Sequence, residues 1–143
     1  MLEIVRQSVA LPAPPGELYA MYLDPVRHAA FTGGGPVEIA AVEGSAWRAF
    51  DGRIHGRILA LSPGRRIVQS WRSFEWEDGD PDAVLVLAFR PAGIGAMVEL
   101  AQVDVPPRLS ETLKSGWPAR YWDPWRAYLE RRPPGKASGR AES

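Results

Sequence analysis

The sequence predicts an α+β fold in which a curved antiparallel sheet of about six to seven strands wraps around one long C-terminal helix. Two observations carry this prediction. Short apolar segments follow one another along most of the chain, separated by turn sequences such as Asp51-Gly52, and Asp-Gly between strands is the strongest short hairpin signal. Segment 107–132 instead repeats large apolar residues every fourth position, as a helix lying against a wide apolar surface does.

The N-terminal part is expected to supply one strand and one or two short helices. Leu2–Leu11 mixes apolar residues, among them Ile4, Val5 and Val9, with polar ones and stops at a proline, which indicates a strand. The helix that follows begins at Pro14-Pro15-Gly16-Glu17, because proline suits a first helical turn and an acidic residue suits the positive end of the helix dipole. This helix is expected to end at Asp24-Pro25, and a second, short one is expected over Val26–Ala30. The glycines that follow lack the lysine and hydroxyl residue of a phosphate-binding loop.

The middle of the chain is expected to form strands in hairpin succession. Successive hairpins imply an antiparallel sheet with one covered face. A sheet of this size curls as it twists, so a cavity between sheet and helix is expected. The predicted strands are Val37–Val42, Trp47–Phe50, Ile54–Leu61, Arg66–Ser73, Val84–Phe89 and Met97–Val103.

The C-terminal helix carries a stripe of large side chains and two prolines. The stripe consists of Leu109, Leu113, Trp117, Tyr121, Trp125 and Leu129. Pro118 is placed to start a helical segment, whereas Pro124 has no amide hydrogen and is expected to clash with the carbonyl of Arg120. The sequence therefore predicts a kink between residues 120 and 124 that turns the rings of Trp122 and Trp125 to different angles. Residues 1–131 are expected to form a single domain and residues 132–143 a disordered tail.

Composition excludes several classes of function. Lys plus Arg and Asp plus Glu number 17 each in the 143 residues, so no net field favours nucleic acid. The chain has no cysteine, which excludes disulfides and thiolate metal sites and fits a cytoplasmic location. The N-terminal MLEIVRQSVALP has no uninterrupted apolar core, so no secretory leader is expected, and no run is long enough for a membrane span. No cofactor and no metal are expected.

The aromatic residues are the candidate binding residues. Two interpretations stay open, an aromatic wall around an apolar ligand and a dense core behind the long helix. Gln69 and Trp71 are expected to share a strand face with Ile67. The residues predicted to line a cavity are Tyr22, Phe31, Trp47, His55, Trp71, Met97, Trp117, Tyr121 and Trp125.

Polar side chains give no catalytic constellation. His55 lies on a predicted strand and is either a ligand contact or a surface residue, and His28 is expected to be a surface or hydrogen-bonded histidine. Neither has a serine in a nucleophile elbow nearby. The acidic run Glu75–Asp82 lacks the spacing of a calcium-binding loop and is expected to be solvated.

Several phrases of the sequence together resemble one known family. They are LPAPPGELY near the start, AFTGG at 30–34, FDGRIHGRILALSPGRRIVQSWR at 50–72, QVDVP at 102–106 and GWPARYWDPW at 116–125. In this order they resemble the family related to the C-terminal domain of the activator of the heat-shock-protein-90 ATPase, a member of the START-like, helix-grip superfamily. The chain departs from that family at Gly44-Ser45-Ala46, where paired glycines are usual, and at Ala96, where threonine is usual.

The resemblance implies three hypotheses for function. The first is a START-like module that binds a small hydrophobic molecule between sheet and helix, without catalysis. The second is a protein-interaction module that contacts a chaperone, although no counterpart of the separate N-terminal domain of the activator is expected within these residues. The third is a cyclase- or hydrolase-type enzyme that uses His55, Glu99 or Tyr121. Either a monomer or a homodimer is compatible with the sequence.

Overall fold

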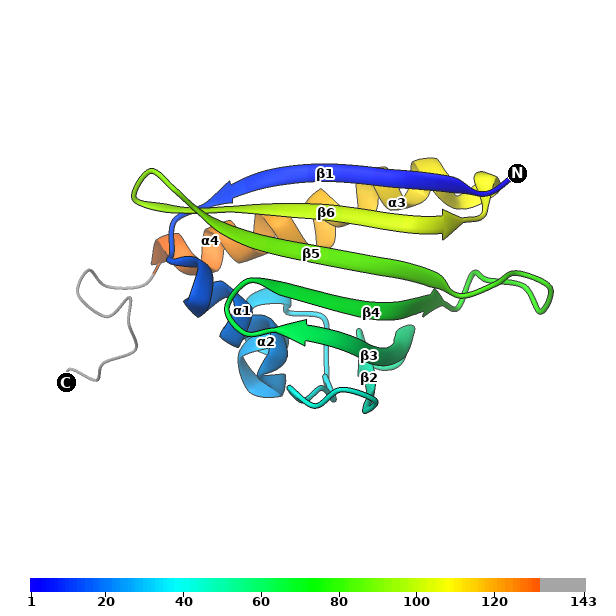
Figure 1. The fold of residues 1–143 in the computed structure, drawn as a ribbon, viewed down its shortest axis with the longest axis horizontal. Helices are drawn as coiled ribbons and strands as arrows, with labels where there is room; N and C mark the ends of the chain where they lie inside the picture. Colours follow the sequence, from blue (N-terminus) through cyan, green and yellow to red (C-terminus); the bar gives the residue numbers. More distant parts are fainter. Residues whose placement is uncertain (132–143) are drawn as a thin grey trace.

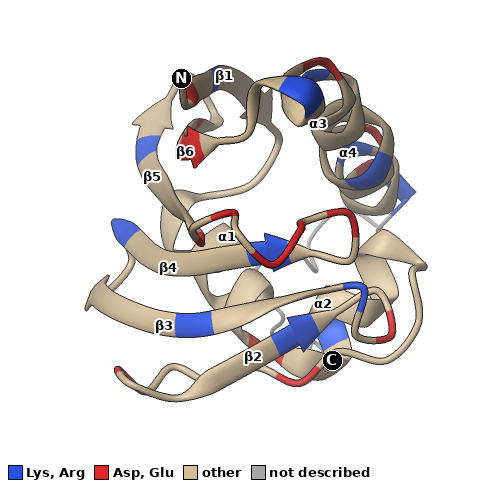
Figure 2. Ribbon diagram, turned by 90° about the vertical axis from the view of Figure 1, so that its right-hand side faces the viewer, with Lys and Arg blue, Asp and Glu red and all other residues tan. Residues whose placement is uncertain are grey.

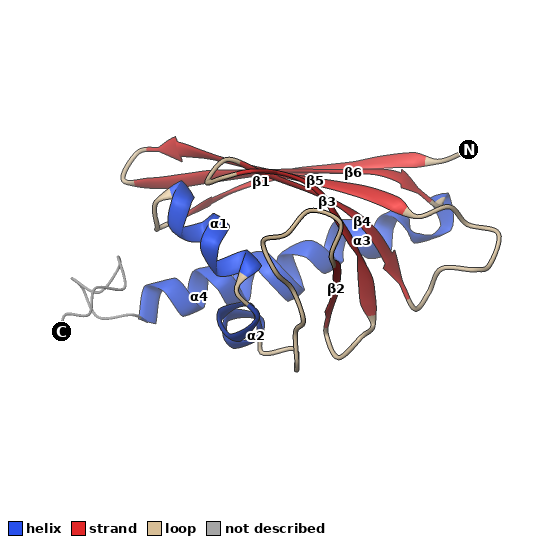
Figure 3. Ribbon diagram, turned by 60° about the horizontal axis from the view of Figure 1, so that its bottom comes forward, coloured by secondary structure: helices blue, strands red, loops and turns tan. Residues whose placement is uncertain are grey.

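The computed structural model describes residues 1–131, in which helices cover one face of a six-stranded antiparallel sheet (Figure 3). The strands are β1 (Glu3–Leu11), β2 (Ala46–Ala49), β3 (Ile54–Ser62), β4 (Arg66–Ser73), β5 (Ala83–Ala92) and β6 (Gly95–Val105). They lie in the order β1-β6-β5-β4-β3-β2 (Figure 1). Viewed from the end, the sheet curves around the helices, with β1 beside α3 and β2 at the far edge (Figure 2). The predicted fold class is confirmed, and the predicted tail lies outside the described residues.

Alternation along the strands separates the two faces of the sheet. In β4, Ile67, Gln69 and Trp71 are buried, whereas the residues between them are half-buried. The same period of two runs through β5 and β6, as expected for strands with one covered face. The predicted grouping of Gln69 and Trp71 with Ile67 is confirmed.

Two short helices follow β1 and lie at one end of the covered face of the sheet, where the first contacts β5 and β6 and the second contacts α4 (Figure 3). They are α1 (Pro15–Leu23) and α2 (Pro25–Thr32), each with a proline in its first turn. Asp24 separates them and caps α2, because its Oδ1 accepts from the amides of Val26 at 2.9 Å and Arg27 at 3.2 Å. Both predicted helices are confirmed.

The predicted strand Val37–Val42 is wrong. Only one bridge forms there, between Glu38 and Arg48 of β2. Ile39 is the one buried residue of this segment, so the alternation that holds a strand against the sheet is missing. The chain turns instead, and Ile58 of β3 exchanges backbone hydrogen bonds with Gly44 and Ser45.

The C-terminal helix runs in segments. A 3₁₀ turn (Pro107–Leu109) leads into α3 (Ser110–Trp117), a π-helical segment (Pro118–Trp122) and α4 (Asp123–Arg131). The Asp123 amide donates to the carbonyl of Pro118, five residues earlier, which is the hydrogen bond of a π turn. The π segment overlaps the region of the predicted kink, residues 120–124, but it begins at Pro118, and Pro124 lies in the first turn of α4. The helical course continues through this wider turn (Figure 3).

Gln7 of β1 clamps this π segment from the sheet. Pro118 has no amide hydrogen, so the carbonyl of Lys114 lacks its usual helical donor. The Nε2 group of Gln7 donates to that carbonyl at 2.7 Å. Its Oε1 accepts from the indole Nε1 of Trp122, also at 2.7 Å. A single amide thus satisfies one polar group on each side of the segment, which holds the helix against β1.

Candidate functional site

Most of the residues predicted to line a cavity lie in the layer between the sheet and the helices. Each of these is buried, with at most 4% of its surface exposed. They are Tyr22, Phe31, Trp47, Trp71, Trp117, Tyr121 and Trp125. The structure thus brings them into one layer, but a part of that layer is solid core.

His55 and Met97 do not belong to this layer, and their prediction as lining residues is wrong. On β3, Ile54 and Ile58 face the helices, and His55 is exposed on the opposite side. On β6, Met97 lies between the buried residues Ala96 and Val98 and therefore also faces outwards. Successive side chains of a strand point to opposite faces, so the strand positions of His55 and Met97 place both side chains on the outer face. For His55, the sequence alone left the face open.

The end of the layer near α2 and α4 is closed. Phe31 of α2 stacks on Trp125 of α4, with ring centroids 4.1 Å apart and an interplanar angle of 8°. Tyr22 of α1 also packs beside Trp125, at 6.5 Å. Offset and stacked aromatic pairs of this kind stabilise a core by about 0.5–1.5 kcal/mol beyond the area that they bury.

His28 forms the polar centre of this closed end. Its Nδ1 lies 2.7 Å from the backbone carbonyl of Tyr22, and its Nε2 lies 2.8 Å from the hydroxyl of Tyr121. A carbonyl only accepts, so Nδ1 carries the proton and Nε2 accepts the Tyr121 hydroxyl hydrogen. Burial lowers the pKa of His28 to about 4, against an ordinary value of 6.5. His28 is therefore a neutral structural residue that ties α2 to the C-terminal helix.

Buried glutamines carry the same network into the sheet. Tyr22 donates to Oε1 of Gln69 on β4 at 2.8 Å, and Trp117 donates to Oε1 of Gln102 on β6 at 2.9 Å. Burial raises the pKa of both Tyr22 and Tyr121, which keeps their hydroxyls protonated as donors. Within residues 1–131, the Nε2 groups of the two glutamines are buried without a hydrogen-bond partner.

The other end of the layer, between α3 and the ends of β3 and β4, is hollow. A cavity of about 100 Å³ opens there. Its walls are mostly apolar and include Phe50, Ile54, Trp71, Leu113, Trp117 and Tyr121. Of the predicted lining residues, only Trp71, Trp117 and Tyr121 reach it. This cavity, called the α3 pocket below, is the candidate functional site.

A buried donor belongs to the wall of the α3 pocket. Trp71 is only 4% exposed, and its buried Nε1 group has no hydrogen-bond partner within the described chain. Leaving such a group unpaired costs about 1–3 kcal/mol.

The rim of the α3 pocket is charged and exposed to solvent. Arg53, Glu75 and Arg120 line it, and each is exposed. The guanidinium of Arg53 lies over the ring of Phe74, 5.7 Å from its centroid, a cation–π contact. Neither arginine side chain has a hydrogen bond or ion pair with another residue in 1–131. The sequence did not predict Arg53 and Arg120 as site residues, because Arg53 lies in the β2–β3 turn and Arg120 lies in a helical segment far along the chain.

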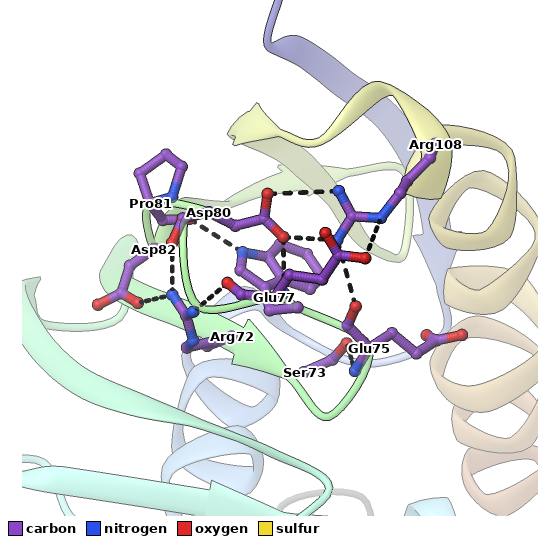
Figure 4. A network of polar contacts seen from close by, with 9 residues as sticks. Arg72, Ser73, Glu75, Glu77, Asp80, Pro81, Asp82 and Arg108 are labelled. Atoms are coloured by element: carbon purple, nitrogen blue, oxygen red, sulfur yellow. Dashed lines mark hydrogen bonds and ion pairs between the residues drawn. The ribbon is translucent and has the colours of Figure 1, made fainter.

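The acidic loop before β5 binds arginine rather than standing free in solvent. Arg72 donates to the carboxylate of Asp82 at 2.9 Å, and Arg108 pairs with Asp80 and Glu77 (Figure 4). Hydrogen bonds from Arg108 are the main cause of the lowered pKa of Asp80. In the described part of the chain, no group of three or more His, Asp or Glu side chains is arranged to hold a metal.

The three side chains that the enzyme hypothesis requires do not meet in one site. Tyr121 faces the helix–sheet layer and donates to His28. Glu99 and His55 are exposed on the other side of the sheet, and Glu99 pairs there with Arg90 at 3.0 Å. Among residues 1–131, no helix is both long and apolar enough to cross a bilayer.

Comparison with known proteins identifies relatives. The model of the family described as activator of Hsp90 ATPase homolog 1-like protein matches residues 12–130. The chain is 36% identical over 75 residues to an uncharacterized protein of Schizosaccharomyces pombe, covering 52% of this chain and 22% of that protein. It is 28% identical over 95 residues to the activator of 90 kDa heat shock protein ATPase homolog 2 of mouse, covering 66% of this chain and 28% of the relative. It therefore spans less than a third of the length of these curated relatives.

Solved structures with the same fold cover nearly all of the described chain. An HSP90 activator from Plasmodium falciparum superposes with a TM-score of 0.79 at 18% identity, over 89% of this chain and 96% of that one. A protein from Chromobacterium violaceum superposes with a TM-score of 0.72 at 28% identity, over 90% of this chain and 98% of that one. The first likeness concerns the fold alone.

Proposed function

The chain belongs to the family of activator of Hsp90 ATPase homolog 1-like proteins, and we propose that it binds a small, mostly apolar molecule in the α3 pocket. The main observation behind this proposal is the cavity. The layer between helices and sheet is filled by side chains at the α4 end, whereas a cavity of about 100 Å³ lies beside Trp71 and Trp117. The walls are mostly apolar, which favours an apolar molecule.

The size of the pocket limits the ligand. An engineered apolar cavity of about 150 Å³ in another protein holds one benzene molecule. A cavity of about 100 Å³ with an exposed rim accordingly suits one aromatic ring or a short chain whose polar end remains at the surface. Ligands of this size gain little binding free energy, so dissociation constants of about 10 μM to 1 mM are expected.

Calorimetric titration with benzamide, benzoate and indole tests this proposal. Gly116 lines the pocket, and a Cβ built there meets no atom within 4 Å. Gly116→Leu should therefore fill the space, keep the fold and abolish binding. The matched control is Ser115→Leu, which adds the same side chain at the neighbouring exposed position outside the pocket and should leave binding unchanged. Absence of binding for every probe, or equal binding by Gly116→Leu, would contradict the proposal.

We also propose contact with a chaperone of the 90 kDa heat-shock class as a second function. The supporting observation is the family match over residues 12–130, together with the name of the mouse relative. Adding the purified protein to the chaperone of its own host should raise the rate of ATP hydrolysis. No stimulation and no complex by analytical ultracentrifugation would argue against this function. A cytoplasmic location and a monomeric or homodimeric state stay predictions of the sequence.

A further inference from the structure

We propose that the α3 pocket selects ligands with one negative charge, and that Arg53 and Arg120 hold the anionic group at the rim. This inference rests on the proposed function, since it names the class of molecule that the pocket takes. The class is a monoanionic, single-ring acid such as an aryl carboxylate. Its ring lies against Trp71 and Trp117, and its carboxylate lies at the exposed mouth.

The first argument is the charge of the rim. Arg53 and Arg120 contribute two positive charges and Glu75 one negative charge, so the titratable side chains that line the pocket sum to +1. The whole chain is neutral, with 17 basic and 17 acidic residues. The surplus is thus local to the mouth, where the apolar wall behind it reduces the screening of a bound anion.

The second argument is that the guanidinium groups of these two arginines have no hydrogen bond or ion pair within residues 1–131. Nearby arginines are used within the protein: Arg72 pairs with Asp82, and Arg108 pairs with Asp80 and Glu77. By contrast, the side chains of Arg53 and Arg120 have no hydrogen bond or ion pair in the described chain, although Glu75 lines the same pocket. Their guanidinium donors remain available, and a guanidinium binds a carboxylate with paired hydrogen bonds.

The third argument is that Arg53 is held in place before any ligand binds. Its guanidinium lies over the ring of Phe74, 5.7 Å from the centroid. Its backbone is fixed on both sides, because its amide donates to Phe50 and its carbonyl accepts from Phe74. A side chain that is already placed loses less conformational entropy when it binds an anion.

The experiment compares benzoate with benzamide, which have the same shape and an acceptor oxygen but differ in charge. Benzoate should bind about tenfold more tightly at pH 7 and low salt, and raising the salt concentration to 0.5 M should weaken benzoate alone. Arg53→Gln and Arg120→Gln should each reduce the affinity for benzoate by about three- to tenfold and leave benzamide unchanged.

The control variant is Arg65→Gln. Arg65 is exposed at the β3–β4 turn, at the opposite end of these strands, and should not affect either probe. Equal affinities for benzoate and benzamide, or an equal loss with Arg65→Gln, would overturn the charge selection while leaving the pocket as a binding site. Failure of benzoate and benzamide to bind while indole binds would overturn this inference alone. Failure of all three probes would overturn the proposed function, and this inference with it.

Discussion

The same helix and the same sheet enclose a solid core at one end and a cavity at the other. At the α4 end, Phe31 and Trp125 stack at 4.1 Å. At the α3 end, Trp71 and Trp117 have ring centroids 6.1 Å apart and line a space of about 100 Å³. Both ends are built from the same kinds of aromatic residue, so the residue types do not decide between core and cavity.

The difference comes from two additional helices. Helices α1 and α2 pack at the α4 end, against the sheet and α4 respectively, where they contribute Tyr22, His28 and Phe31 to the interior (Figure 3). At the α3 end, no helix of the described chain fills this position, and Phe50 and Phe74 only flank the space. An aromatic stripe therefore forms a core where another element packs against it and a pocket wall where none does.

The largest effect is expected from a matched pair of truncations. Phe31→Ala should lower the free energy of unfolding by about 3–5 kcal/mol, because the ring is buried and stacks on Trp125. Phe50→Ala should cost less than half as much, since Phe50 is half-buried beside an existing cavity. Urea denaturation of both variants measures the difference. Equal losses would show that the two ends are packed alike.

Acid should weaken the closed end through His28. Its pKa is about 4 in the folded protein against 6.5 when unperturbed, so the unfolded chain binds the extra proton in this window. The stability that the neutral ring provides is complete above pH 6.5 and is lost as the pH falls to 4. At about 1.4 kcal/mol per pH unit, the loss is roughly 3 kcal/mol.

A comparison of histidine variants isolates this contribution. The chain has two histidines, and His55 is exposed on the outer face of the sheet. Urea denaturation between pH 7 and 4 should give a flatter profile for His28→Gln than for the parent protein. His55→Gln should keep the parent profile. If His28→Gln retained the full loss, other groups would be responsible for it.

Tyr121 contributes to both the closed end and the α3 pocket, and a substitution can test the role of its hydroxyl apart from that of its ring. Its hydroxyl donates to His28, whereas its ring lines the α3 pocket. Tyr121→Phe should lower the free energy of unfolding by about 1–3 kcal/mol, because the Nε2 of His28 loses its only donor in the described chain. Ligand affinity should stay within about twofold, since the ring remains. A large loss of affinity together with unchanged stability would reverse this assignment.

The sequence predicted the parts of the fold that local patterns determine. Hairpin turns, strand alternation and the proline helix starts located each element except Val37–Val42, where apolar residues occur without a buried face. The outward positions of His55 and Met97 depend on which strand face is covered, and local sequence does not fix that. His28 and Phe31 are three residues apart on one helix face, and this spacing was the available signal that His28 is buried.

The candidate site was less predictable, because it joins distant segments. Arg53 follows β2, Trp71 lies on β4, and Arg120 lies in the π segment. No short-range pattern connects these positions. The role of Gln7 was equally hard to predict. Its side chain bonds to Lys114 and Trp122, which lie more than a hundred residues away in the sequence, so the sequence around Gln7 does not reveal these contacts.

Nuclear magnetic resonance of the indole N–H groups tests the contrast between the two ends most directly. The chain has six tryptophans, each of which gives one resonance that a Trp→Phe variant assigns. Titration with benzoate should shift the signals of Trp71 and Trp117, which line the pocket, and leave Trp47 and Trp125 in place. Unchanged signals up to the solubility limit, or a shift of Trp125 without Trp71, would contradict the account.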